Sequence, residues 1–175
     1  MTISSSKITT IGLLVALSII LTRLASIRIA IGGVEGIRIG LGRLPIILGG
    51  ILFGPVAGGI IGALSDFIGY FVSGIGAYMP HFTLTSALGG IIPGVIINLK
   101  KEEFNTFDLA IAITTGQIIT SLLLTPYFLH ILFRLSWLVL LPPRLIAEPV
   151  QIFIYTYTIN LMLKRNFFRI KSDKI

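Results

Sequence analysis

The chain has 175 residues, of which 54% are hydrophobic and only 12% are charged, and its formal net charge is +7. Soluble domains usually contain about 25% charged residues, so this composition excludes a soluble enzyme, a disordered chain and a coiled coil. The basic residues lie in short gaps between apolar runs rather than on a polar surface, which argues against nucleic-acid binding. The sequence therefore predicts an integral membrane protein in which residues 1–175 form one domain.

Six apolar segments follow one another along the chain when prolines, glycine clusters and charges are taken as boundaries. A helix needs about 20 residues to cross a hydrocarbon core of about 30 Å, and the segments lack the polar–apolar alternation of β-barrel strands. We therefore expect an all-α protein with six transmembrane helices, the second of which is short and either tilted or partly re-entrant. The predicted spans cover residues 8–24, 39–52, 55–72, 82–98, 109–132 and 143–163.

The lysines indicate how these spans are oriented. Six spans place both termini on one side, and the lysines flank that side, so the positive-inside rule makes it cytoplasmic. The other side has arginines, and a guanidinium grips carboxylates more readily than an ammonium group does; some of these arginines can instead simply extend to the outer lipid headgroups. The lysines are Lys7, Lys100, Lys101, Lys164, Lys171 and Lys174, and the outer arginines are Arg23, Arg28, Arg38, Arg43, Arg134 and Arg144.

Small residues recur at every fourth position in two places, and this spacing permits close helix contact in a membrane. In the first span, Gly12 and Ala16 are expected to serve either internal packing or a partner helix. A longer ladder crosses the turn between spans two and three, where we favour internal packing. Its members are Gly50, Gly54, Gly58 and Gly62.

A charged pair is predicted in the hairpin that spans two and three form. Arg43 precedes Gly54 by as many residues as Asp66 follows Pro55, so the two side chains are expected at the same depth. A charge inside a membrane needs a partner or a function. The sequence therefore predicts an Arg43–Asp66 ion pair, which either clamps the hairpin or orients Arg43 toward an anionic ligand.

Two outer connections, residues 27–42 and 73–82, are rich in glycine, and we expect them to be flexible loops that close over a ligand. Aromatic side chains in such loops are able to stack on a flat ring, although an interfacial aromatic belt has the same composition. The candidates are Tyr78, His81, Phe82 and, in the last outer loop, Trp137.

The sixth span contains a polar stripe. Proline suits the first turn of a helix, so Pro142-Pro143 predicts a helix that starts at Pro143. Arg144, Glu148 and Gln151 then share one helix face. This face is expected to line a polar cavity rather than to meet lipid; alternatively, Arg144 and Glu148 only neutralise each other.

The sequence contains none of the motifs that would give this chain a chemistry of its own. The G-x-x-x-x-G-K-[ST], G-x-S-x-G and H-E-x-x-H patterns are absent, there is no cysteine, and the two histidines lie far apart. We therefore expect no catalytic residues, no metal site and no cofactor bound by this chain. The remaining interpretation is a small membrane protein that binds a ligand and depends on another protein for energy.

The motifs RIGLGRLP, YMPHFTL and PPR, together with LPIIL, FGP and SDFIGY between them, are now recognisable. The stretch 36–93 and the last span resemble the folate-specific substrate-binding (S) components of energy-coupling factor (ECF) transporters. The resemblance implies a vitamin-capturing subunit in the cytoplasmic membrane of a prokaryote. It also implies a membrane scaffold subunit, which Gly12 and Ala16 would contact, and two ATP-binding-cassette ATPases that use ATP in the cytoplasm.

Folate suits the candidate residues. Its glutamate tail is a dianion that matches Arg38, Arg43 and Arg144, and its flat rings match the aromatic candidates. Glu148 is the leading acceptor for the amide and amino groups of the pterin, followed by Glu35 and Asp66. The alternatives are an S component for biotin, a flavin or thiamin, an autonomous small channel, or a small membrane enzyme.

Overall fold

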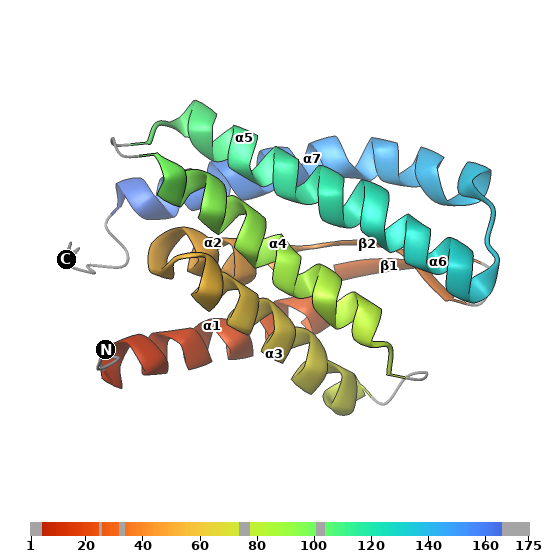
Figure 1. Cartoon of the computed structure of the whole chain (residues 1–175), viewed down its shortest axis with the longest axis horizontal. Helices are drawn as coiled ribbons and strands as arrows, with labels where there is room; N and C mark the ends of the chain where they lie inside the picture. Colours follow the sequence, from red (N-terminus) through yellow and green to blue (C-terminus); the bar gives the residue numbers. More distant parts are fainter. Residues whose placement is uncertain (1–4, 25, 32–33, 74–77, 101–103, 166–175) are drawn as a thin grey trace.

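The computed structural model describes residues 5–24, 26–31, 34–73, 78–100 and 104–165. Helices make up almost all of it, and they are stacked side by side in a bundle (Figure 1). The helices are α1 (Ser5–Leu24), α2 (Leu44–Phe53), α3 (Pro55–Ser73), α4 (Pro80–Leu99), α5 (Thr106–Gln117), α6 (Thr125–Phe133) and α7 (Trp137–Lys164). A short 3-10 helix, η1 (Leu41–Arg43), leads into α2, and a π-helix, η2 (Ile118–Leu124), joins α5 to α6.

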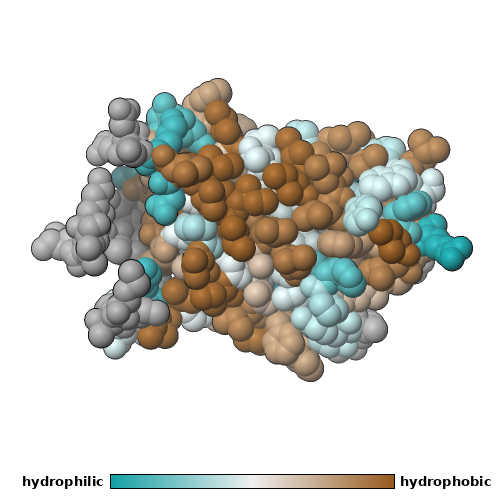
Figure 2. Space-filling view, viewed as in Figure 1, coloured by the Kyte–Doolittle hydropathy of each residue, from teal (hydrophilic) through white to brown (hydrophobic). Residues whose placement is uncertain are grey.

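The helices have the lengths and the surface of a membrane protein. Within the described residues, five helical segments are long and apolar enough to cross a bilayer, and α5, η2 and α6 together form one of them, Thr106–Phe133. The η1–α2 segment, Leu41–Phe53, is a shorter apolar helix, as expected for the second span. Hydrophobic residues cover the middle of the face in Figure 2, and hydrophilic ones lie toward its two ends. The start of α1 and the end of α7 lie at the same end of the bundle (Figure 1).

The first outer connection is a β-hairpin rather than a flexible loop. Strands β1 (Ser26–Ile31) and β2 (Val34–Gly40) pair in antiparallel register, with Arg28 opposite Arg38 and an irregularity after Ile29. Isoleucines alternate with other residues in both strands, which is the pattern of a strand. The glycines outweighed this pattern in the sequence-based prediction, and the all-α prediction therefore missed this small sheet. The second connection is shorter than the predicted residues 73–82, because Ser73 belongs to α3 and α4 begins at Pro80. Residues 74–77 of it lie outside the described residues.

The last helix starts earlier than predicted. It begins at Trp137, so Pro142, Pro143 and Pro149 lie inside α7, and Trp137 belongs to the helix rather than to a loop. Proline favours a helix start but is also tolerated inside membrane helices, where neighbouring groups satisfy the freed carbonyls. The proline pair is therefore a weaker boundary signal here than in a soluble protein.

Glycines bring the backbones of α2, α3 and α4 into direct contact. A Cβ atom on Gly50 would lie 2.2 Å from the carbonyl oxygen of Gly90, and one on Gly62 would lie 2.3 Å from that of Ser86. A Cβ atom on Gly58 would be similarly close to backbone atoms of both Gly50 and Gly90. The packing interpretation of the glycine ladder is thus confirmed for these positions. Gly54 has another role, since it makes the turn between α2 and α3 with a φ of 91°, which glycine adopts without strain.

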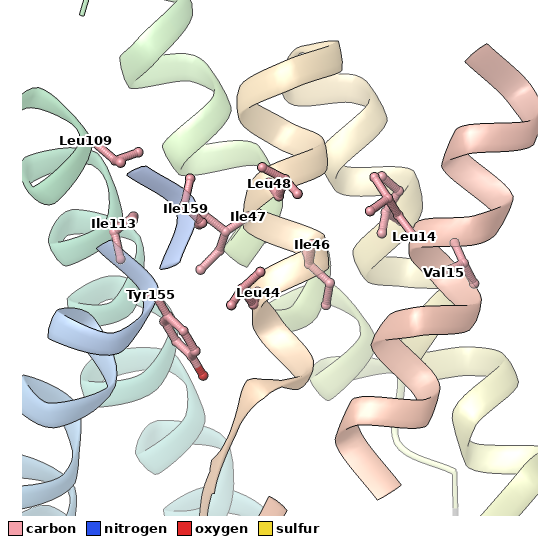
Figure 3. Packing of buried hydrophobic residues seen from close by; sticks show 11 residues of the cluster. Leu14, Val15, Leu44, Ile46, Ile47, Leu48, Leu109, Ile113, Tyr155 and Ile159 are labelled. Atoms are coloured by element: carbon pink, nitrogen blue, oxygen red, sulfur yellow. The ribbon is translucent and has the colours of Figure 1, made fainter. Parts of the chain in front are cut away.

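An apolar cluster joins α1, α2, α3, α5 and α7 in the interior (Figure 3). Leu14 comes from α1, Ile47 and Leu48 from α2, Ile113 from α5 and Ile159 from α7, and all are almost completely buried. Tyr155 of α7 packs at the edge of this cluster, and its hydroxyl group points away from Ile113 (Figure 3). The polar part of the interior begins at this hydroxyl group.

Candidate functional site

Polar side chains gather inside the bundle where η1, α5, η2 and α7 meet. We call this group the polar cluster. All members except the half-buried Arg43 are buried, with exposed fractions of 6% or less. The polar cluster consists of Arg43, Gln117, Thr120, Ser121, Arg144, Glu148, Gln151 and Tyr155. Buried polar groups in a membrane protein are costly and usually functional.

Arg43 enters the polar cluster from the start of α2 and binds neutral groups. Its Nη1 donates to Gln117 Oε1 at 2.7 Å and to Thr120 Oγ1 at 3.2 Å. The Thr120 hydroxyl donates in turn to the carbonyl of Gly116, so its oxygen is available as an acceptor. Among the described residues, no carboxylate pairs with Arg43.

The predicted Arg43–Asp66 ion pair is therefore wrong. Asp66 accepts a hydrogen bond from the Thr83 hydroxyl at 2.6 Å, and Tyr78 reaches the same hydroxyl oxygen at 2.9 Å. Asp66 thus bonds toward α4, whereas Arg43 bonds toward α5 and η2. Counting residues from the turn gives the depth of a side chain but not its direction around the helix axis, which is why the prediction failed.

A π-helix shapes the next part of the polar cluster. The backbone N–H of Thr125 bonds to the carbonyl of Thr120, five residues earlier, and the Thr125 hydroxyl bonds to the same oxygen. The following residue, Pro126, has no N–H to offer to the carbonyl of Ser121. Arg144 Nη1 donates to that carbonyl at 3.0 Å. The irregular turn therefore provides an acceptor for a buried guanidinium, in line with the frequent use of π-bulges at functional sites.

Ser121 connects Arg144 and Glu148. Its carbonyl accepts from Arg144, and its hydroxyl donates to Glu148 Oε1. Within the described part of the chain, Arg144 and Glu148 do not form a direct ion pair with each other. The polar face of α7 turns into the protein, because Arg144, Glu148 and Gln151 are only 5%, 4% and 5% exposed. The prediction that this face avoids lipid is confirmed. The alternative, in which Arg144 and Glu148 only neutralise each other, is not supported.

Tyr155 closes the polar cluster on its inner side. Its hydroxyl group lies 2.8 Å from Gln151 Oε1 and also donates to the carbonyl of Gly40, the last residue of β2. Because the ring is buried in the apolar cluster and the hydroxyl is bonded on the polar side, Tyr155 marks the boundary between them.

The aromatic candidates do not join the polar cluster through any ring contact of the described residues. Tyr78 packs against Phe67 and Tyr70 of α3, with ring centroids 5.5 and 5.3 Å apart. Within α4, Phe82 is half-buried and His81 is exposed. The His81 ring lies 5.0 Å from that of Phe128 in α6, and Trp137 lies 5.5 Å from His130. The aromatic candidates therefore lie in separate groups, and their binding of a ligand stays a prediction.

Two further sets of predicted residues lie elsewhere. Glu35 and Arg38 are on β2, but their side chains fall outside the described part of the structure. Gly12 and Ala16 are exposed on α1, and a Cβ atom on Gly12 would meet no atom within 4 Å. This face of α1 is therefore not used for packing within the described structure.

The sequence analysis missed four members of the polar cluster, although a signal for them exists. Gln117, Thr120 and Ser121 form a polar stripe at helical spacing inside an apolar span, and Tyr155 continues the α7 stripe one turn beyond Gln151. Hydroxyl groups are common in membrane helices because they can bond to their own backbone. The two hydroxyl residues therefore gave no clear signal, and only the glutamine marks the stripe in α5 and η2 as unusual.

The comparisons with known proteins agree with this architecture. Residues 2–165 match the model of a family described as the S component of ECF-type riboflavin transporters. The chain belongs to this family of S components of ECF-type transporters, which are membrane transport proteins.

One relative is the folate transporter FolT of Clostridium novyi (strain NT), which is 36% identical over 146 residues, covering 83% of this chain and 81% of that protein. The fold is similar to the crystal structure of FolT bound with folic acid, with a TM-score of 0.76, 24% identity and coverage of 90% and 91%. A second similar structure is the S component of a bacterial ECF transporter, with a TM-score of 0.68, 19% identity and coverage of 95% and 98%. The prediction of a helical membrane protein with the S-component fold is confirmed.

Proposed function

We propose that the chain is the folate-binding S component of an ECF transporter, which captures folate from outside the cell and delivers it to the cytoplasm. One observation carries this choice of ligand. Glu148 is a buried carboxylate, 4% exposed, whose Oε2 has no hydrogen-bond partner among the described residues. A buried acceptor of this kind favours a ligand with N–H donors. The folate transporter among the relatives supports the same ligand.

Glu148 also distinguishes folate from riboflavin. The pyrimidine edge of a pterin presents an amino group next to a ring N–H, so two adjacent donors face a carboxylate. The corresponding edge of a flavin has a carbonyl on each side of its N–H, and one of these oxygens would face Glu148. The polar cluster also contains the guanidinium groups of Arg43 and Arg144. A guanidinium suits the carboxylates of a dianionic vitamin and gives a neutral flavin no advantage.

The proposal predicts a clear preference of the purified protein. The chain, isolated in detergent without other subunits, is expected to bind folic acid at least a hundredfold more tightly than riboflavin in isothermal titration calorimetry. An equal or reversed preference would contradict the folate assignment and favour a flavin. Ion conductance in lipid bilayers without any ligand binding would instead indicate a channel.

The energy for transport is proposed to come from partner subunits. An S component works with a membrane scaffold subunit and two cytoplasmic ATPases, and ATP is used by these ATPases rather than by this chain. The exposed small residues of α1, Gly12 and Ala16, are the proposed contact with the scaffold. The lysines at the end of the bundle that holds the start of α1 and the end of α7 support a cytoplasmic position for that end. The proposed location is the cytoplasmic membrane of a prokaryote, and no enzymatic activity is proposed.

Replacement of Arg144 with alanine is expected to weaken folate binding by about 2 kcal/mol, or about thirtyfold, which is typical for a hydrogen bond to a charged group. The substitution removes a buried positive charge and leaves the carbonyl of Ser121 without this donor. The dissociation constant of folic acid measured by calorimetry tests this. The control is Arg165→Ala, because Arg165 is exposed just beyond the other end of α7. Affinity within twofold of the parent for Arg144→Ala would remove Arg144 from the binding site.

A further inference from the structure

Gln117 presents a buried donor to the interior of the bundle. The residue is 2% exposed and ends α5. Its Oε1 accepts from Arg43 Nη1 at 2.7 Å, and since a guanidinium can only donate, this bond fixes which end of the amide is oxygen. The other end, Nε2, has no hydrogen-bond partner among the described residues. A buried amide N–H in that condition favours a ligand with an acceptor.

The acceptor of Glu148 is held by a residue about one turn from Gln117. Gln117 ends α5 and Ser121 lies four residues later in the π-helix η2, so the two residues are about one turn apart along the same span. Ser121 holds Glu148 Oε1 through its hydroxyl group, while Glu148 Oε2 has no partner in the described residues. The site therefore offers a buried N–H donor and a buried carboxylate acceptor, which is held by a residue about one turn from the donor.

We propose that Gln117 and Glu148 together bind the pyrimidine edge of the pterin and that Gln117 selects the group at its 4-position. Glu148 accepts from the 2-amino group and the ring N–H, and Gln117 donates to the 4-oxo group. This inference rests on the proposed folate-binding function. The inference adds two things to that function: a residue that determines specificity, and the orientation of the bound ligand.

The orientation follows from the charges. The pterin is neutral, whereas the glutamate tail carries two carboxylates, which Glu148 would repel and which are costly to remove from water. One turn from Glu148 toward the start of α7 lies Arg144, and the β1–β2 hairpin lies on the same half of the bundle (Figure 1). The pterin therefore lies inward and the glutamate tail lies toward the hairpin.

A change of preference between two ligands tests the role of Gln117. Aminopterin has a 4-amino group, a donor, in place of the 4-oxo acceptor of folic acid, and its ring nitrogen N3 carries no hydrogen. The change at N3 faces Glu148 in the parent and in the variant alike, so it cancels when the ratio of the two ligands is compared between them. The substitution Gln117→Glu keeps an oxygen for Arg43 and replaces the amide donor with an acceptor. Calorimetry is expected to show that folic acid binds this variant at least tenfold more weakly than it binds the parent. The ratio of the aminopterin to the folic acid dissociation constant is expected to fall at least tenfold.

The matched control is Gln151→Glu, the same chemical change at the other buried glutamine of the polar cluster. It is expected to leave the ratio between the two ligands within twofold of the parent, whatever its effect on affinity. An unchanged ratio in Gln117→Glu, with the melting temperature of the ligand-free protein maintained, would overturn the inference. If that variant does not fold, Glu148→Gln replaces it, and an unaltered folic acid affinity there would overturn the inference equally.

Pteroate, which is folate without the glutamate, tests the orientation. Gln117→Glu is expected to weaken pteroate and folic acid binding by the same factor, because both contain the pterin. If the variant binds folic acid more weakly but binds pteroate as well as the parent does, Gln117 lies at the glutamate end. That result would overturn this inference but not the proposed function. If the parent protein binds neither compound, the proposed function fails, and this inference fails with it.

Discussion

Leucine in place of Gly12 or Ala16 is expected to abolish ATP-driven folate uptake by the assembled transporter while leaving folate binding to the isolated chain unchanged. Both residues are exposed on α1, and Gly12 has open space where a Cβ atom would lie. A side chain added there disturbs nothing inside the chain. It would, however, separate two helix backbones that meet closely through small residues.

Uptake of radiolabelled folate into proteoliposomes that contain the whole complex measures this effect, with calorimetry on the isolated chain beside it. Gly12→Ala is the conservative control, since alanine is itself a small residue, and it is expected to retain uptake. Equal losses of binding and uptake in the leucine variants would show that this face of α1 stabilises the chain itself.

Alanine in place of Gly90 is expected to lower the free energy of unfolding by about 3 kcal/mol, the upper end of the usual range for overpacking. The new Cβ atom would lie 2.4 Å from the carbonyl oxygen of Gly58 and 2.5 Å from its carbonyl carbon. These are backbone atoms, so no side-chain rotation can relieve the clash, and α3 and α4 have to move apart. The melting temperature of the ligand-free protein in detergent measures the loss.

The adjacent glycine gives a matched control for this experiment. Gly89 is also buried within α4, but a Cβ atom there would meet no atom within 4 Å. Gly89→Ala is expected to leave the melting temperature unchanged or to raise it slightly, because alanine favours a helix over glycine. Similar losses in both variants would mean that helix α4 is sensitive to any substitution here, rather than to contact with Gly58.

The positions of the membrane helices could be predicted from hydropathy because each helix must satisfy its own backbone in lipid. The predicted spans 55–72 and 82–98 differ from α3 and α4 by two residues or fewer at each end. The β1–β2 hairpin could not be read in the same way, since its glycines and isoleucines give opposite signals. Nor did the sequence reveal that α7 begins at Trp137, since a proline pair inside a membrane helix looks like a start.

The candidate site was predicted better on α7 than elsewhere. A charged and amide stripe at helical spacing identifies a buried face by itself, and Arg144, Glu148 and Gln151 all lie inside the bundle. The partners of that face come from a helix that is distant in the sequence, and no spacing rule pairs them. Arg43 shows the same limit, because its bonds to Gln117 and Thr120 depend on how α2 is rotated relative to α5.

The π-helix between α5 and α6 limits how the length of this span can vary during evolution. Deleting one residue from Ile118–Leu124 would remove the extra residue that makes this turn of the span Thr106–Phe133 a π-helix. Every residue beyond the deletion would then turn by about 100° around the helix axis. Phe128 would rotate away from His81, and the geometry that now presents the Ser121 carbonyl to Arg144 would be lost. Insertions and deletions should therefore be tolerated in the connections between helices but selected against at this one turn inside the membrane.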